Sequence, residues 1–329
     1  MEFRLSFTPK PFIQKIEHQH QLFLAGSCFT EQIGAKLTNY KFKTIENPNG
    51  ILFNPISISE NIISYINQKE YAKDDLFLHN EIWGSWNHHT KFSDVSQTNA
   101  LEKINHSQKA AYEFLKNADW LIITLGSSYV YELENNRVVA NCHKVPTDKF
   151  NKKLLSALEV EAAMGEMIEK LKVFNPTIKI IFTISPVRHL RDGFVENNRS
   201  KANLITAIHE LVAAFENCFY FPSYELIIDD LRDYRFYAED MVHPNYQATQ
   251  YVWEKFTTAC IDEKSLLIMK EISIIIAAKN HRPFNPSSNQ HLQFLKTNLE
   301  KSLNLHQSYP HLDLKVEIDF FENGINNFK

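Results

Sequence analysis

The sequence predicts an α/β protein of three-layer α/β/α architecture, with a doubly wound parallel sheet between two layers of helices and a C-terminal helical extension. Short apolar runs of strand length alternate with longer stretches of helical periodicity, which is typical of such folds. The chain has 329 residues, of which 44% are hydrophobic, and it can therefore bury a full core. From about residue 261 onward only helical patterns continue.

Five short runs predict the strands of this sheet. In chain order they are Gln21–Ala25, Lys43–Ile45, Trp120–Leu125, Lys179–Ile184 and Cys218–Phe221. The second run is the least apolar. Runs of this length that lack regular polar alternation are typical of parallel strands buried on both faces.

Helical patterns separate these runs. Phe29, Ile33 and Leu37 recur at i, i+4 and i+8 after the first strand, as on one face of a helix. A second stripe precedes the fifth strand and consists of Leu204, Ile205, Ile208, Leu211, Val212 and Phe215. The stretch Phe77–Asp94 fits no regular element, and it is long enough to be a functional loop or lid.

The change of pattern divides the chain into a main domain, residues 1–260, and a C-terminal extension, residues 261–329. The extension contains a long helix through Leu267–Ala278, the irregular segment His281–Pro286 and another helical segment. We expect it to pack on the main domain.

Charge and composition exclude several classes of protein. The formal net charge of -4 at pH 7 leaves no basic footprint, so nucleic acid is not an expected partner. No apolar run reaches the roughly 18 residues of a membrane helix, and the N-terminus does not resemble a signal peptide. These features predict a soluble, cytoplasmic protein. The four cysteines form no CxxC pair, so neither a metal site nor a disulfide framework is indicated, and no cofactor is expected.

A serine occupies the position that favours nucleophilic catalysis. Ser27 follows the first predicted strand and precedes a helical pattern, and α/β hydrolases commonly hold their nucleophile at such a strand-to-helix turn. A helix cap is the alternative, because serine is favoured at that position too. The neighbouring Cys28 is a weaker candidate nucleophile, since the turn directs only one of the two side chains inward.

An acid and a base lie near the end of the main domain. Asp240 and His243 are three residues apart in a loop that precedes a helical pattern from about Asn245. In a Ser/His/Asp arrangement, His243 would take the proton of Ser27, and Asp240 would hold the imidazole tautomer.

Glycines suggest where an oxyanion would bind. Of only eight glycines, Gly26, Gly50 and Gly126 fall in loops after the first three predicted strands. Glycine lets backbone N–H groups approach a ligand closely. We therefore expect the oxyanion hole to involve Gly50, Gly126 and the N–H of Ser27 or Cys28.

These motifs resemble a known family. Gly26-Ser27-Cys28-Phe29 matches the motif that names the GSCFA domain, a mostly bacterial branch related to the SGNH (GDSL-like) hydrolases. Further similar segments follow in the expected order: Asn47–Pro55, Thr124–Ser127, Ser185–His189, Phe221–Glu225 and Arg232–Pro244. The resemblance implies a three-layer α/β/α fold, with Ser27 as nucleophile and Asp240 and His243 as the other triad members.

The chain also departs from the wider SGNH pattern. The serine stands one place earlier in the first block. The asparagine that normally follows the third-block glycine is absent, because Gly126 is followed by Ser127 and Ser128. Ser128, Ser127 or a side chain within Asn47–Asn54 is the candidate replacement in the oxyanion hole.

Other residues are candidates for substrate binding. Trp86 and His88 lie in the irregular stretch, and Arg188 and His189 follow the fourth strand at the edge where Ser27 lies. Aromatic side chains stack on sugars but also fill cores. The arginine and histidine would hold an anionic or polyol substrate, or else pair with acidic neighbours.

The sequence thus predicts a serine-dependent hydrolase of carboxylic esters, acting on an acetylated carbohydrate or another small acylated molecule. One alternative is an acyltransferase that uses the same acyl-enzyme. Another is a non-catalytic carbohydrate-binding module, which the missing asparagine favours and the intact Ser27, Asp240 and His243 oppose. The oligomeric state is not predicted.

Overall fold

The computed structural model describes residues 5–328, which form two compact units. The sheet unit comprises the described residues up to Phe12 together with Gln21–Gly34 and Thr44–Ala259. The helical unit comprises Ile13–His20, Ala35–Lys43 and the described residues from Cys260 onward. Two short segments from the first part of the chain therefore join the C-terminal helices in one unit.

The sheet unit is built on a five-stranded parallel sheet in the order β10-β9-β5-β1-β2. The strands are β1 (Gln21–Gly26), β2 (Lys43–Glu46), β5 (Trp120–Leu125), β9 (Lys179–Ile184) and β10 (Cys218–Tyr220). All five predicted strands are confirmed, with ends that differ by at most one residue.

The strand order reverses between β1 and β5. β1 pairs in parallel with β5, in the register Leu22↔Trp120 to Gly26↔Thr124, and β5 pairs in parallel with β9. The chain thus builds outward from β1 to β2 on one side and from β5 to β9 and β10 on the other. In open α/β sheets, ligands bind beyond the carboxyl ends of the strands at such a switch point.

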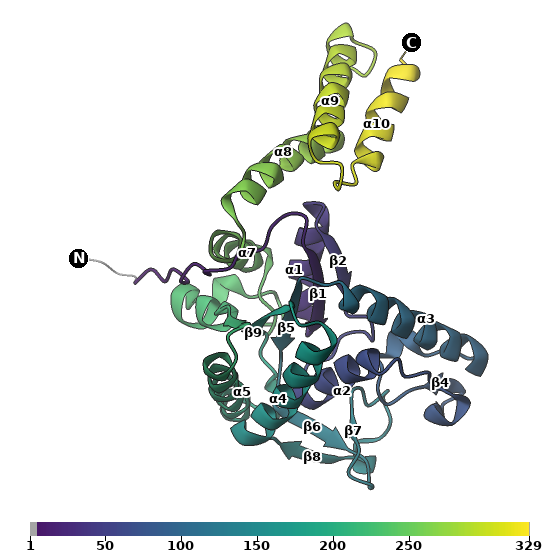
Figure 1. The fold of residues 1–329 in the computed structure, drawn as a ribbon, viewed down its shortest axis with the longest axis vertical. Coiled ribbons are helices and arrows are strands. Elements are labelled where there is room, and N and C mark those ends of the chain that lie inside the picture. Colours follow the sequence, from purple (N-terminus) through teal and green to yellow (C-terminus); the bar gives the residue numbers. More distant parts are fainter. Residues whose placement is uncertain (1–4, 329) are drawn as a thin grey trace. The chain divides into compact units, whose positions relative to one another are not determined.

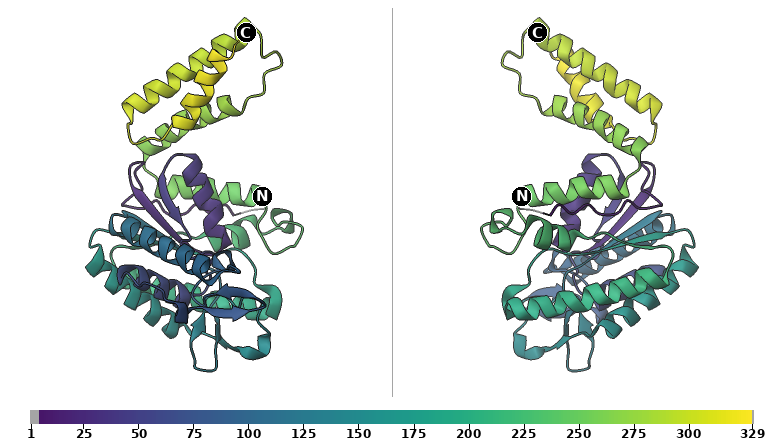
Figure 2. Two further views of the ribbon diagram at one scale, coloured as in Figure 1. Left: turned by 90° about the vertical axis from the view of Figure 1, so that its right-hand side faces the viewer. Right: turned by 90° about the vertical axis from the view of Figure 1, so that its left-hand side faces the viewer.

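Helices cover both faces of the sheet (Figures 1 and 2). One face contributes Phe23, Ile123 and Phe182 to a buried core. The helices of that core are α2 (Pro55–Ile66), α3 (Gln97–Lys116), α4 (Ala157–Phe174) and α5 (Phe194–Ala214). On the opposite face lie α1 (Cys28–Asn39) and α7 (Tyr246–Cys260), where Thr249 donates a 2.9 Å hydrogen bond to Gln32. The predicted three-layer fold is confirmed.

Sequence signals explain where these helices begin. Asn54 accepts the backbone N–H of Ser57 at 2.8 Å and caps α2, whose first residue is proline, a residue with no N–H to leave unpaired. Ser156 and Glu159 form a capping box at the start of α4, which satisfies two backbone donors at once.

The stretch Phe77–Asp94 is more regular than predicted. It contains an antiparallel hairpin of β3 (Phe77–His79) and β4 (Ile82–Gly84), and the turn residues Asn80 and Glu81 have φ of 48° and 63°. The expectation of no regular element is wrong, because strands of three residues are too short for an alternating pattern to be detected. A second antiparallel sheet that was not predicted joins β6 (Tyr129–Glu132), β7 (Val138–Val139) and β8 (Asn151–Leu154).

The helical unit contains α8 (Glu263–Asn280), α9 (Asn289–Ser308) and α10 (Lys315–Asn326). The second helical segment predicted after residue 286 is thus two helices. Their apolar faces form a separate core that includes Ile272 and Phe321, together with Leu314, which precedes α10.

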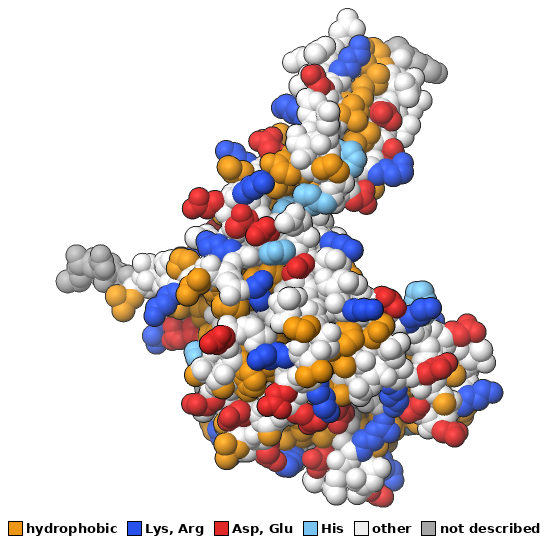
Figure 3. Space-filling view, viewed as in Figure 1, with side chains coloured by type: hydrophobic (Ala, Val, Ile, Leu, Met, Phe, Trp, Pro, Cys, Tyr) orange, Lys and Arg blue, Asp and Glu red, His pale blue; other side chains and the backbone are white. Residues whose placement is uncertain are grey.

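The surface charges of the chain are mixed. Figure 3 shows Lys and Arg side chains interspersed with Asp and Glu on the face in view, in line with the formal net charge of -4. Among the described residues, the helices are all too short or too polar to cross a membrane.

Candidate active site

Ser27 lies at the switch point of the sheet, in the single-residue turn between β1 and α1. Its N–H donates to the carbonyl of Thr124 at 3.1 Å. The turn is tight because Gly26 has φ of 143°, and a Cβ there would stand 2.2 Å from the Thr124 carbonyl oxygen. The backbone of this turn is therefore fixed against the end of β5.

The hydroxyl of Ser27 is buried without a partner. The side chain is 2% exposed, and Oγ makes no hydrogen bond. The N–H of Thr30 donates at 2.8 Å to the backbone carbonyl of Ser27 rather than to its hydroxyl. Ser27 thus does not act as a side-chain cap of α1, and its hydroxyl is available for another task.

Asp240 and His243 form the expected pair. Oδ2 of Asp240 lies 2.6 Å from Nδ1 of His243, and Oδ1 accepts the N–H groups of His243 at 3.0 Å and of Val242 at 2.9 Å. These two backbone donors, and then the imidazole, lower the pKa of Asp240 to about 2. The ionised carboxylate can only accept, so Nδ1 of His243 carries the hydrogen, and in the neutral ring Nε2 is left with a lone pair.

The Asp240–His243 loop docks beside the segment that follows β9. The N–H of Arg188 donates to the carbonyl of Val242 at 3.2 Å, and the Arg188 guanidinium lies 4.0 Å from the ring centroid of Tyr237. The loop and Ser27 therefore both belong to the carboxyl side of the sheet. No hydrogen bond joins them, because the Ser27 hydroxyl has no partner.

Most of the predicted oxyanion donors already have partners. The N–H of Gly50 donates to the Asn47 carbonyl at 2.7 Å, and that of Gly126 to the Phe53 carbonyl at 2.8 Å. Ser128 donates its N–H to the Ser200 hydroxyl at 2.8 Å and its own hydroxyl to the Ser200 carbonyl at 3.1 Å. In this arrangement these groups are not free to bind an acyl oxygen.

The asparagines proposed as replacements also make local hydrogen bonds. Oδ1 of Asn47 accepts the N–H of Gly26 at 2.8 Å, the amide of Asn49 donates to Asn61, and Asn54 caps α2. The N–H of Cys28 begins α1 and donates to no backbone carbonyl of the described chain. It is therefore the predicted backbone donor that stays available, at the positive end of a helix dipole.

Lys201 was not predicted. This side chain of α5 is 1% exposed, and its Nζ donates to the carbonyls of Gly126 and Ser185, each at 2.6 Å. Burial lowers the pKa of Lys201 to about 7, and Cys28 is near enough to interact with it electrostatically. The spacing to Leu204 and Ile208 is the signal that could have identified it, since a lysine at i and apolar residues at i+3 and i+7 share one helix face.

His189 lies at the same edge of the sheet. Its Nε2 is buried and makes no hydrogen bond, and its ring centroid is 5.4 Å from that of Phe53. Burial, followed by the charges of Lys201 and His243, lowers the pKa of His189 to about 3. The imidazole is therefore neutral at physiological pH.

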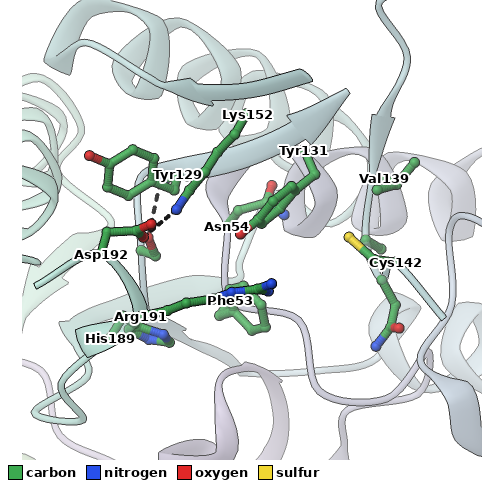
Figure 4. Close-up of a pocket in the computed structure, with 13 residues that line it drawn as sticks. Phe53, Asn54, Tyr129, Tyr131, Val139, Cys142, Lys152, His189, Arg191 and Asp192 are labelled. Atoms are coloured by element: carbon green, nitrogen blue, oxygen red, sulfur yellow. Dashed lines mark hydrogen bonds and ion pairs between the residues drawn. The ribbon is translucent and has the colours of Figure 1, made fainter. Parts of the chain in front are cut away.

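A cavity of about 270 Å³ opens beside His189. Figure 4 shows its walls, with Tyr129 and Tyr131 above Phe53 and with the Arg191 side chain lying beside Phe53. Lys152 and Asp192, which also line the cavity, form an ion pair. The remaining lining residues are Asn54, Ser127, Val139, Ala140, Asn141 and Cys142. Aromatic walls with a few amide and charged groups are typical of pockets that bind small molecules.

Of the four predicted substrate residues, only His189 lines this cavity, and Arg188, Trp86 and His88 do not. Trp86 stacks on Phe77 with 3.7 Å between ring centroids. His88 is fully buried, its Nδ1 is 2.9 Å from the Ser85 hydroxyl, and burial lowers its pKa to about 3. Both side chains pack within the hairpin region. For the aromatic residues, packing in a core was the alternative to stacking on a sugar.

The alternative of Cys28 as the nucleophile gains no support. Burial raises the pKa of the Cys28 thiol, which leaves less thiolate to act as a nucleophile. Within residues 5–328, no cluster of three or more His, Cys, Asp or Glu side chains has a geometry that could hold a metal ion.

The fold and this site define a doubly wound α/β protein with a serine at its switch point and a carboxylate-bound histidine at the same sheet edge. Residues 21–256 match the GSCFA family, and residues 272–327 match the C-terminal domain of GSCFA domain proteins. The chain belongs to the GSCFA family, which confirms the resemblance inferred from its motifs. No curated protein matches the sequence.

Three solved structures resemble the chain distantly. A carbohydrate esterase family 3 protein from Talaromyces cellulolyticus has 10% identity and a TM-score of 0.36, covering 77% of this chain and 99% of its own. A mutant acetyl esterase with acetate ion has 10% identity and a TM-score of 0.36, covering 77% and 100%. The acetyl xylan esterase Est2A from the rumen bacterium Butyrivibrio proteoclasticus has 11% identity and a TM-score of 0.38, covering 73% and 63%.

Proposed function

We propose that this protein hydrolyses carboxylic esters of a small acylated molecule, with Ser27 as nucleophile, His243 as general base and Asp240 as its partner. The observation that carries the proposal is the Asp240–His243 pair, with 2.6 Å between Oδ2 and Nδ1, at the sheet edge where the buried Ser27 hydroxyl has no hydrogen-bond partner. An oriented histidine and an unpaired hydroxyl at one edge of the sheet are what acyl transfer to serine requires.

The chemistry follows from these groups. Ser27 Oγ attacks the acyl carbon while Nε2 of His243 takes its proton, and the Asp240 carboxylate stabilises the imidazolium. The protonated imidazole then gives its proton to the departing alcohol, and a water molecule attacks the acyl-enzyme by the same route. The N–H of Cys28 at the start of α1 would donate to the oxyanion.

The cavity beside His189 supports a carbohydrate as the alcohol part of the ester. Tyr129, Tyr131 and Phe53 provide aromatic surface, and the Asn54 and Asn141 side chains line the same cavity. Sugar rings pack their apolar faces on aromatic rings and use their hydroxyls on polar groups. An acetylated sugar therefore suits this cavity.

A labelling experiment tests the proposal. A fluorophosphonate probe should modify Ser27, and Ser27→Ala should abolish both the labelling and the hydrolysis of short-chain aryl esters and acetylated sugars. Cys28→Ser is the matched control at the adjacent position and should retain the label. A probe found on another residue by peptide mass spectrometry, or full turnover in Ser27→Ala, would remove Ser27 from this role.

Acyl transfer is the second candidate, and the burial of Ser27 favours it. A side chain that is 2% exposed belongs to an environment with little water, in which a bound hydroxyl can accept the acyl group in place of water. Adding free sugars to the ester assay distinguishes the two reactions. Acylated sugar as the main product would indicate a transferase, and sugar binding without turnover by the wild type would indicate a binding module.

A further inference from the structure

The candidate oxyanion hole lacks a side-chain donor. Gly50, Gly126 and Ser128 use their N–H groups elsewhere, and the side chains of the nearby asparagines are engaged in caps and turns. Cys28 alone would supply one backbone donor. Oxyanion holes usually combine two or more donors, and losing one typically lowers kcat by about 10²- to 10³-fold.

The imidazole of His189 lies against Gly126, the glycine that is not followed by the usual asparagine. A Cβ added at Gly126 would stand 3.1 Å from Nε2 of His189 and 2.7 Å from Cβ of Phe53. Because Gly126 has no side chain, the imidazole of His189 can lie close to the backbone just after β5. The backbone N–H of His189 donates to Oδ1 of Asn197 at 2.8 Å, which holds this residue against α5.

His189 is close enough to two charged or titratable groups of this region to interact with them electrostatically. These groups are Lys201 and His243. Lys201 donates to the Gly126 carbonyl and interacts with Cys28, the neighbour of the proposed nucleophile. His243 is the proposed base. The His189 ring therefore belongs to the same edge as the reacting groups.

The protonation state of His189 suits a donor. Burial and the nearby positive charge oppose protonation of the ring and lower its pKa to about 3. A neutral imidazole carries one N–H, and with Nε2 buried and unpaired, placing the hydrogen on Nε2 provides a donor that is not satisfied by any described residue. Such an N–H gains a partner when an oxyanion forms next to it.

We propose that the Nε2–H of His189 is a side-chain donor of the oxyanion hole and replaces the asparagine that the third block lacks. This inference rests on the proposed function. As the bond between Ser27 Oγ and the acyl carbon forms, the carbonyl π electrons move to the oxygen and His243 takes the serine proton. His189 donates a hydrogen bond to this oxygen and keeps its proton. When the carbonyl reforms, the ester C–O bond breaks and the alcohol leaves with the proton from His243.

The first test measures steady-state hydrolysis of an aryl acetate. His189→Phe keeps an aromatic ring but removes the donor, and we expect kcat to fall about 10²-fold or more with KM changed less than about threefold, since the bond forms in the transition state. His189→Asn and His189→Gln place an amide donor at the same position and should recover part of the loss. His209→Phe, on the exposed side of α5, is the matched control and should keep the wild-type rate.

A pH profile separates a donor from a base. Because His189 keeps its proton, the acidic limb of the kcat profile should persist in His189→Asn, whereas a limb that disappears would identify His189 as the base and overturn the proposal. The proposal would also be overturned if the Phe, Asn and Gln variants all had a kcat within about threefold of the wild-type value. A wild type that is inactive on all esters and unlabelled at Ser27 would refute the proposed function and this inference with it. Melting curves show which variants are folded. If the Phe variant does not fold, the kcat values and pH profiles of the Asn and Gln variants test the proposal.

Discussion

Lys201→Met is expected to remove a pH-dependent component of the stability of the sheet unit. The lysine is 1% exposed, and burial lowers its pKa from 10.5 to about 7 in the folded protein. Methionine has a similar length and no charge. The substitution therefore keeps much of the packing while it removes the titrating group and its two hydrogen bonds, to Gly126 and Ser185.

The sign of the effect follows from the two pKa values. Below pH 7, Lys201 is protonated in both the folded and the unfolded chain. The buried charge then lowers the free energy of unfolding by its full amount. Between pH 7 and pH 10.5, the unfolded chain holds a proton that folded Lys201 has lost, so the free energy of unfolding rises with pH by up to about 1.4 kcal/mol per unit. Above pH 10.5 no further change is due to this residue. In the methionine variant this rise is absent.

Urea unfolding of both proteins at several pH values provides the measurement. The free energy of unfolding of the wild type minus that of Lys201→Met should increase by about 2 to 3 kcal/mol from pH 7.5 to pH 9.5. Taking the difference between the two proteins removes the contributions of all groups that titrate in the same way in both. Lys170→Met, an exposed position on α4 whose lysine pairs with Glu166, is the matched control. A wild-type-to-variant difference that stays constant across this range would mean that Lys201 keeps its proton in the fold, and would refute the reasoning.

Three further predictions concern the site and the helical unit. Asp240→Asn should lower kcat by about 10³-fold or more, because the imidazole loses the acceptor that sets its tautomer, while the melting temperature hardly changes because the carboxylate is half exposed; nearly full activity would show that another acid serves the base. Gly126→Ala should cost about 1 to 3 kcal/mol in urea unfolding, since its Cβ would stand 2.7 Å from that of Phe53, and an unchanged midpoint would mean that the loop has room to move. Lys279→Met should lower the stability of the helical unit by about 2 kcal/mol, because Glu317, which is 1% exposed, loses a partner at 2.9 Å; chemical unfolding that leaves the stability unchanged would show that this ion pair makes no net contribution.

Much of the fold could be predicted from the order of residues along the chain. The five strands of the main sheet follow from short buried runs, and the turn at Gly26 and Ser27 follows from their position between a strand and a helical stripe. Asp240 and His243 pair within one short loop, so their spacing alone suggests the contact. In each case the deciding interactions are local, and the sequence pattern reports them directly.

The rest depends on contacts between distant segments. The short strands of the β3–β4 hairpin leave no pattern of their own, and the strand order that makes Ser27 face β5 depends on how the helices pack. His189 and Lys201 meet Gly126 from 63 and 75 positions further along the chain. No local pattern encodes these meetings, because they depend on the register of β5 against β9 and on the face that α5 turns to the sheet. The sequence by itself determined the strands, the turn and the acid–base pair, whereas tertiary packing decided which polar groups surround the serine.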